Sequence, residues 1–212
     1  PSWEQKEKRN LYLITILFLA ATVFWSLYEQ GGSTLNLFAE KSTETKILGN
    51  EFPSSWFQSL NPIYIICLAP IFAWLWSRIG NETLSNIGKF AIVLLFMGFG
   101  WAIMIFAAIE AQNGNLVSPL WLATMYFLHA IGEMFVSPVG LSAISKLAPK
   151  SMTGLTMGIW FLASSIGSYI GGRIAGLYET FSIADIFATL TLVAVIASIS
   201  LGLLRRRFSL SA

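Results

Sequence analysis

Three polar side chains of different chemistry share one face of a predicted helix. Tyr126, His129 and Glu133 are three and four residues apart, so a helix places a phenol, an imidazole and a carboxylate in one stripe. A carboxylate inside an apolar segment is costly when it faces lipid, so Glu133 should face protein or a watery cavity. We interpret Glu133 as a substrate or proton site, with a structural hydrogen-bond anchor as the alternative. A lone histidine such as His129 is more often a packed residue.

Two further pairs combine an aromatic ring with a polar group at helical spacing. Trp25 and Glu29 are four residues apart and share a face, as do Trp160 and Ser164. Glu29 is either one half of a gating ion pair or a carboxylate that reaches the outer interface. Trp160 and Ser164 are candidates for the wall of a cavity.

An asparagine and two prolines also interrupt apolar segments. Asn61 stands directly before Pro62, a pattern typical of a helix N-cap, with a functional amide as the alternative. Pro70 and Pro138 each remove a backbone hydrogen bond from a helix. Each is a candidate hinge, and a static bend is the alternative.

The glycines that follow Trp160 are spaced for close helix packing. Gly167 with Gly171, and Gly172 with Gly176, each place two small residues four positions apart. This spacing lets two helix backbones approach closely in membranes. We therefore expect this helix to pack tightly against a neighbour.

Composition places all of these residues in a membrane protein. Hydrophobic residues make up 55% of the 212 residues and charged residues only 11%, against about 25% in an average soluble domain. Long uncharged runs predict an all-α membrane protein with six transmembrane helices, each near the ~20 residues that cross a bilayer. The predicted spans are residues 11–38, 54–77, 87–109, 119–146, 152–176 and 184–205. They form one transmembrane bundle over residues 11–207.

The distribution of basic residues predicts the orientation of the bundle. Six spans put both termini on one side, and ten of the thirteen basic residues fall on that side. Lys and Arg favour the cytoplasmic side of a membrane. We therefore expect a multi-pass protein of the plasma (inner) membrane, with residues 1–10 as a cytoplasmic arm and residues 208–212 as a cytoplasmic tail. The ten residues are Lys6, Lys8, Arg9, Arg78, Lys89, Lys146, Lys150, Arg205, Arg206 and Arg207.

Several function classes find no support in the sequence. A net charge of +2 gives no argument for a nucleic-acid partner. One cysteine and one histidine leave no internal disulfide and no zinc cluster. Phosphate-binding loops, zinc-peptidase motifs and serine-nucleophile motifs are absent from the sequence. We expect no enzyme activity, no metal and no organic cofactor, whereas a six-span structural or interaction protein remains an alternative.

Four segments together resemble a known family. FWSLYEQGGSTLNLFA, SSWFQSLNPIYIICLAPIFAWLW, GEMFVSPVGLSAISKLAP and MTGLTMGIWFLASSIGSYIGG are similar to the second half of bacterial proton-dependent oligopeptide transporters. These are the POT/PTR branch of the major facilitator superfamily. The resemblance covers nearly the whole chain in order. It implies helices seven to twelve of a twelve-helix symporter, with an N-terminal six-helix half as partner, di- and tripeptides as substrates and protons as the coupling ion.

The resemblance also implies roles for single residues. Glu133 would contact the amino terminus of the peptide, and Asn61 would bind the peptide, which replaces its interpretation as a cap. Glu29 would pair with an arginine of the first helix in an outer gate. The remaining substrate-binding positions would be Tyr126, Trp25, Trp160 and Ser164.

Two departures from the family pattern limit what the resemblance implies. Some bacterial members carry two consecutive acidic residues where this chain has Tyr28 and Glu29, so side-chain preference is expected to differ. The family's ExxER coupling motif and its pocket lysine and tyrosines belong to the first half and have no counterpart in these 212 residues. Transport of another small solute, such as an amino acid, nitrate or a drug-like compound, is the alternative within the same fold.

Overall fold

The chain folds into a bundle of long helices. The computed structural model describes residues 5–47, 49–79, 85–136, 140–149 and 152–209. The α-helices are α1 (Gln5–Tyr28), α2 (Thr34–Ser42), α3 (Leu60–Ile79), α4 (Asn86–Ala111), α5 (Leu120–Val136), α6 (Gly140–Leu147), α7 (Thr153–Ala175) and α8 (Ile183–Ser209). Shorter elements are the 3-10 turns η1 (Glu29–Gly31), η2 (Ser54–Ser59) and η4 (Gly176–Glu179), and the antiparallel strands β1 (Lys46–Ile47) and β2 (Asn50–Glu51).

Four helical segments in the described part of the chain are long and apolar enough to cross a membrane. They cover Glu7–Ser42, Ser54–Arg78, Asn86–Ala111 and Ile183–Arg206. The other two predicted spans correspond to α5, with 17 residues, and to α7, whose 23 residues include five glycines that lower its hydropathy. The all-α membrane class predicted from the sequence is confirmed, and four of the six predicted spans meet both conditions.

Two predicted spans differ in detail from the helices of the structure. Helix α1 begins at Gln5 instead of residue 11, because the charged stretch QKEKR consists of good helix formers. The described part of the span predicted over residues 119–146 consists of α5 and α6. Pro138 falls between them, outside the described residues, so the structure says nothing of the hinge predicted there. Pro70 lies in the middle of α3.

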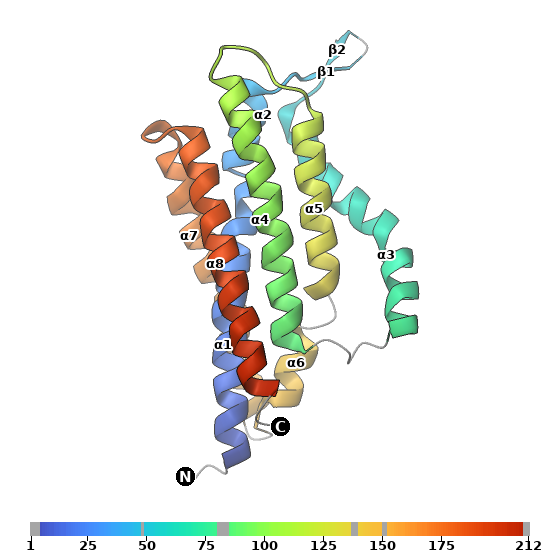
Figure 1. The fold of residues 1–212 in the computed structure, drawn as a ribbon, viewed down its shortest axis with the longest axis vertical. Helices are drawn as coiled ribbons and strands as arrows, with labels where there is room; N and C mark the ends of the chain where they lie inside the picture. Colours follow the sequence, from blue (N-terminus) through green and yellow to red (C-terminus); the bar gives the residue numbers. More distant parts are fainter. Residues whose placement is uncertain (1–4, 48, 80–84, 137–139, 150–151, 210–212) are drawn as a thin grey trace.

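Helix α4 lies at the centre of the bundle, between α8 and α5 (Figure 1). The beginning of α1 and the end of α8 lie at one end of the bundle, and β1 and β2 lie at the other. Trp101 of α4 is fully buried, with its ring 5.6 Å from Phe187 of α8. Helix α3 leans away from the bundle and packs mainly on α5, through ring pairs such as Tyr64 with Phe127.

Helices α1 and α7 approach each other at the two glycines singled out above. A Cβ added at Gly167 would lie 2.5 Å from Trp25 Cβ, and one added at Gly171 would lie 3.1 Å from Glu29 Cβ. Buried Gln30 joins the two helices, because its Nε2 donates to the carbonyl of Gly171 at 3.0 Å. The tight packing predicted from the glycine spacing is therefore present at Gly167 and Gly171, whereas a Cβ added at Gly172 or Gly176 would have no atom within 4 Å.

Replacing Gly167 by alanine is expected to destabilise the α1–α7 contact. The added methyl would meet main-chain and Cβ atoms that cannot rotate away, and overpacking of this kind costs about 1–3 kcal/mol. Thermal unfolding of the intact protein in detergent measures the effect. Gly172→Ala is the matched control, because its Cβ would have no atom within 4 Å. Equal Tm values for the two variants would contradict the expectation.

Candidate functional site

A polar cavity of about 220 Å³ lies near the end of α1, where η1 meets η2, α3 and α5. Side chains of three different segments converge there, so the cavity depends on the tertiary fold. Its lining combines two phenols, a carboxylate, two amides and an imidazole. The lining residues are Tyr28, Glu29, Gly31, Gly32, Gln58, Asn61, Tyr126 and His129.

Asn61 is the centre of the hydrogen bonding at this cavity. Its Nδ2 donates to the hydroxyl of Tyr28 at 3.0 Å and to Oε2 of Glu133 at 3.1 Å, which uses both amide hydrogens. Its Oδ1 is buried and accepts no hydrogen bond from any residue that the structure describes. Asn61 is the second residue of α3 and lies within the helix. The N-cap interpretation of Asn61 is therefore wrong, because the helix begins one residue earlier.

The stripe predicted on α5 faces this cavity. Tyr126 and His129 both line it, and half-buried Glu133 reaches it through Asn61. The Tyr126 hydroxyl donates to the carbonyl of Gly31 at 3.2 Å, which joins α5 to the turn after α1. His129 packs with its ring 5.4 Å from that of Trp101, and its edge lies against Gly100 of α4. The histidine is packed into the core at the base of the cavity.

Glu29 lies at the junction of α1, α7 and the cavity. Its Oε1 accepts a hydrogen bond from Ser168 Oγ of α7 at 3.1 Å. Glu29 forms no ion pair with a residue in the described ranges. The carboxylate is partly exposed at the cavity wall.

Besides Glu133, which reaches the cavity only through Asn61, three of the predicted substrate-binding residues do not line it. Trp25 packs edge-on against Tyr28, with ring centroids 5.5 Å apart, and its Cβ lies against Gly167. The ring of Trp160 is 6.3 Å from that of Phe90, and Ser164 Oγ donates to its own helix at the carbonyl of Phe161. The structure brings Trp25 next to a lining residue, whereas it places Trp160 and Ser164 elsewhere on the bundle.

Two side chains of the lining, apart from the glycines, were not predicted. Tyr28 appeared in the sequence only as a departure beside Glu29, and Gln58 lies in the η2 segment before α3. The signal for Tyr28 was its position three residues after Trp25 and directly before a carboxylate. Gln58 had no local signal, because only the path of η2 brings it to the cavity.

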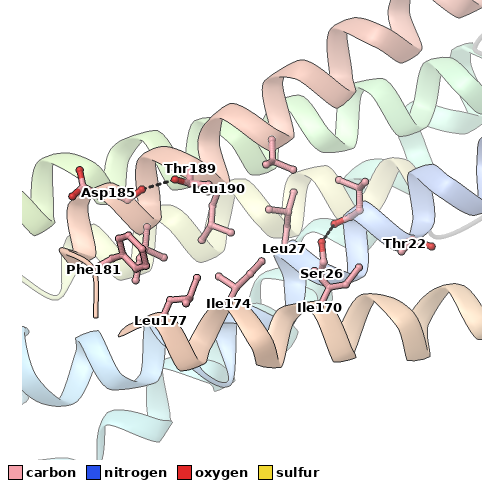
Figure 2. Close-up of a pocket in the computed structure, with 13 residues that line it drawn as sticks. Thr22, Ser26, Leu27, Ile170, Ile174, Leu177, Phe181, Asp185, Thr189 and Leu190 are labelled. Carbon is pink, nitrogen blue, oxygen red and sulfur yellow. Dashed lines mark hydrogen bonds between the residues drawn. The ribbon is translucent and has the colours of Figure 1, made fainter. Parts of the chain in front are cut away.

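A larger cavity of about 370 Å³ lies between α1, α7 and α8, and it is apolar. Figure 2 shows Leu27, Ile174 and Leu190 between these helices. Its hydroxyl groups are already used within their own helices, since Ser26 donates to Val23 and Thr189 donates to Asp185. The smaller polar cavity at Asn61 is therefore the better candidate for binding a polar solute.

Comparison with known proteins gives consistent matches over nearly the whole chain. The family model PTR2, described as POT family, matches residues 2–193. The chain is 38% identical over 193 residues to the uncharacterized transporter YclF of Bacillus subtilis (strain 168), covering 91% of this chain and 39% of the relative. It is 41% identical over 176 residues to the peptide transporter YePEPT of Yersinia enterocolitica, covering 81% of this chain and 34% of the relative.

Solved structures agree with these matches. The crystal structure of peptide transporter POT in complex with sulfate is 35% identical, with a TM-score of 0.89. The match covers 98% of this chain and 42% of that one. The chain thus spans about two fifths of the length of the proteins that it resembles.

Proposed function

Since this chain belongs to the POT family, we propose that it forms the C-terminal half of a proton-coupled di- and tripeptide symporter. The observation that carries the proposal is the amide of Asn61, bonded to both Tyr28 and Glu133 beside a polar cavity. An N-terminal six-helix half of the same transporter completes the site. The intact protein works by alternating access, with substrate bound between the two halves.

The polar cluster suits the ammonium end of a peptide. An ammonium group donates three hydrogen bonds and accepts none. The Glu133 carboxylate supplies a negative acceptor, held in place by the Asn61 amide. All peptides share this charged end, so such a contact gives affinity independent of sequence. Tyr126 at the cavity and Trp25 beside it are proposed to accept different side chains by apolar contact. Trp160 and Ser164, which lie elsewhere on this bundle, are proposed to contact the substrate where it lies between the two halves.

Glu29 is the proposed gating residue. It lines the cavity and has no cationic partner in the described part of the chain. An arginine of the other half would pair with it when the outer side closes. Pro70, inside α3, and Pro138 are candidate hinges for the same movement. Protons are the coupling ion, and the transporter uses no organic cofactor or metal.

The bundle is proposed to lie in the plasma (inner) membrane with both ends of this segment in the cytoplasm. The support is the excess of Lys and Arg at the end of the bundle where α1 begins and α8 ends. A protease site placed after Ala212 is expected to be cut in inside-out vesicles and protected in right-side-out vesicles. Cleavage in right-side-out vesicles would show that the orientation is the opposite of the one proposed.

A competition assay tests the proposed cargo. We expect uptake of a labelled dipeptide by the intact protein in proteoliposomes to depend on an inward proton gradient. Unlabelled di- and tripeptides should compete, whereas free amino acids and nitrate should not. Equal competition by nitrate or by a free amino acid would show that the transporter carries another small solute. Absence of any ligand-dependent uptake, with no thermal stabilisation by dipeptide, would favour a structural protein.

A further inference from the structure

The described structure contains a second polar feature, at the opposite end of the bundle from β1 and β2. Helices α4 and α8 touch closely at Gly98, where a Cβ would lie 3.1 Å from Val195 Cγ2. Ser198 Oγ of α8 then donates to the carbonyl of Ala91 of α4 at 2.7 Å. Beyond this bond, a Cβ added at Gly202 of α8 would have no atom within 4 Å. An open groove of about 780 Å³ results.

The groove has an apolar floor and a basic end. Its walls carry small and aliphatic residues, with Leu95, Ile199 and Leu203 exposed on its surface. Arg205 and Arg206 lie at the end nearest the beginning of α4. The remaining lining residues are Gly88, Ala91, Ile92, Ser198 and Gly202. A volume of this size is comparable with small-molecule sites, which enclose about 300–1,000 Å³.

The two arginines are free to bind an anion. Both side chains are exposed, and neither guanidinium forms an ion pair within the described ranges. Arg205 extends over Gly88, since its Cδ and Nη1 lie 3.2 Å and 3.3 Å from the Cβ position of that glycine. A Cβ at Gly88 would crowd this side chain, so the glycine lets the guanidinium lie close over α4. The groove therefore combines positive charge with an adjoining apolar channel.

The location of the groove favours a lipid over a soluble ligand. The helices that form it, α4 and α8, are both apolar enough to span a membrane, and no residue of the groove lines the polar cavity at Asn61. Basic pockets between transmembrane helices near the membrane surface are suited to anionic headgroups. The cavity in Figure 2 lacks this feature, because its one charged lining residue is Asp185.

We propose that the groove between α4 and α8 is a binding site for an anionic phospholipid. The phosphate group contacts Arg205 and Arg206, because guanidinium groups form paired hydrogen bonds with phosphate oxygens. The beginning of an acyl chain lies along Gly202, Ser198 and Ile199. This inference uses the membrane embedding of the chain and does not depend on the proposed cargo.

Lipid retention by the intact transporter tests the proposal. The protein is purified, reconstituted in nanodiscs that contain equal phosphatidylglycerol and phosphatidylethanolamine, and released for native mass spectrometry. We expect wild type to retain phosphatidylglycerol preferentially. Arg205→Gln/Arg206→Gln should reduce that retention roughly tenfold or more, because each basic side chain near a surface adds to the attraction of anionic lipid. Gly202→Phe keeps both charges but fills the groove, and it should reduce retention as well.

The control is a matched loss of two positive charges elsewhere. Arg78→Gln/Lys146→Gln removes two exposed basic side chains outside the groove, and it should retain phosphatidylglycerol like wild type. Thermal unfolding of each variant confirms that the bundle is folded. Equal loss in the control pair would show a general charge effect and overturn the site. Unchanged retention in Arg205→Gln/Arg206→Gln, or in Gly202→Phe, would also overturn it, as would equal retention of the two lipids by wild type.

Discussion

Uptake of a labelled dipeptide should fall to background when Glu133 is changed to glutamine in the intact transporter. The substitution keeps the shape of the side chain and an oxygen that can accept from Asn61 Nδ2 at the present 3.1 Å. It removes the negative charge that we propose to hold the peptide ammonium. Hydrogen bonds to a charged group are stronger than neutral ones, so we expect affinity to fall on the order of tenfold to a hundredfold. Proteoliposome uptake and equilibrium binding measure the two effects.

A carboxylate far from the cavity serves as the control for this result. Glu110 lies at the far end of α4, is exposed, and accepts a hydrogen bond from Trp121 Nε1 at 3.2 Å. Glu110→Gln changes the net charge by the same amount and should transport like wild type. If Glu133→Gln took up dipeptide normally at normal expression, Glu133 would not be part of the binding site.

Changing Asn61 to leucine should have the second largest effect. Leucine is similar in volume but donates to neither Tyr28 nor Glu133, so both contacts of 3.0 Å and 3.1 Å disappear. The half-buried carboxylate then loses the hydrogen bond that the amide donates. We expect dipeptide affinity to fall roughly tenfold or more, since a buried group left without its partner carries the full desolvation cost.

A variant of Tyr28 distinguishes between the two hydrogen bonds that the Asn61 amide donates. Tyr28→Phe removes one acceptor and leaves the bond between Asn61 and Glu133 in place. Its effect on affinity should be only a few-fold, because a neutral hydrogen bond contributes about 0.5–1.5 kcal/mol. If Tyr28→Phe impaired binding as much as Asn61→Leu, the phenol and not the pairing with Glu133 would be the essential partner.

Local spacing predicted the parts of the site that lie on a single helix. Tyr126, His129 and Glu133 share a face because α5 is regular over that stretch. The same reasoning predicted the close approach at Gly167 and Gly171, since small residues four apart form a flat strip on a helix. Both inferences depend only on helical periodicity, which the sequence carries in full.

Helical periodicity could not predict the contacts between different helices. Tyr28 and Asn61 are 33 positions apart and Asn61 and Glu133 are 72 apart, and no local pattern sets the register of such pairs. The N-cap interpretation of Asn61 was wrong for a related reason, because the η2 turn continues directly into α3 and starts the helix one residue earlier. The family resemblance supplied the role of Asn61, and the geometry supplied its partners.

The glycine contacts and the Gln30 bridge have a mechanical consequence for α1 and α7. Gln30 donates to the carbonyls of Ser26 and Gly171, and the two backbones interlock at Gly167. At Gly167 and Gly171, α7 has no side chain that could rotate and let the two helices slide past each other. The two helices should therefore tilt together as one rigid unit, so that a force on Glu29, directly after α1, moves α7 as well as α1.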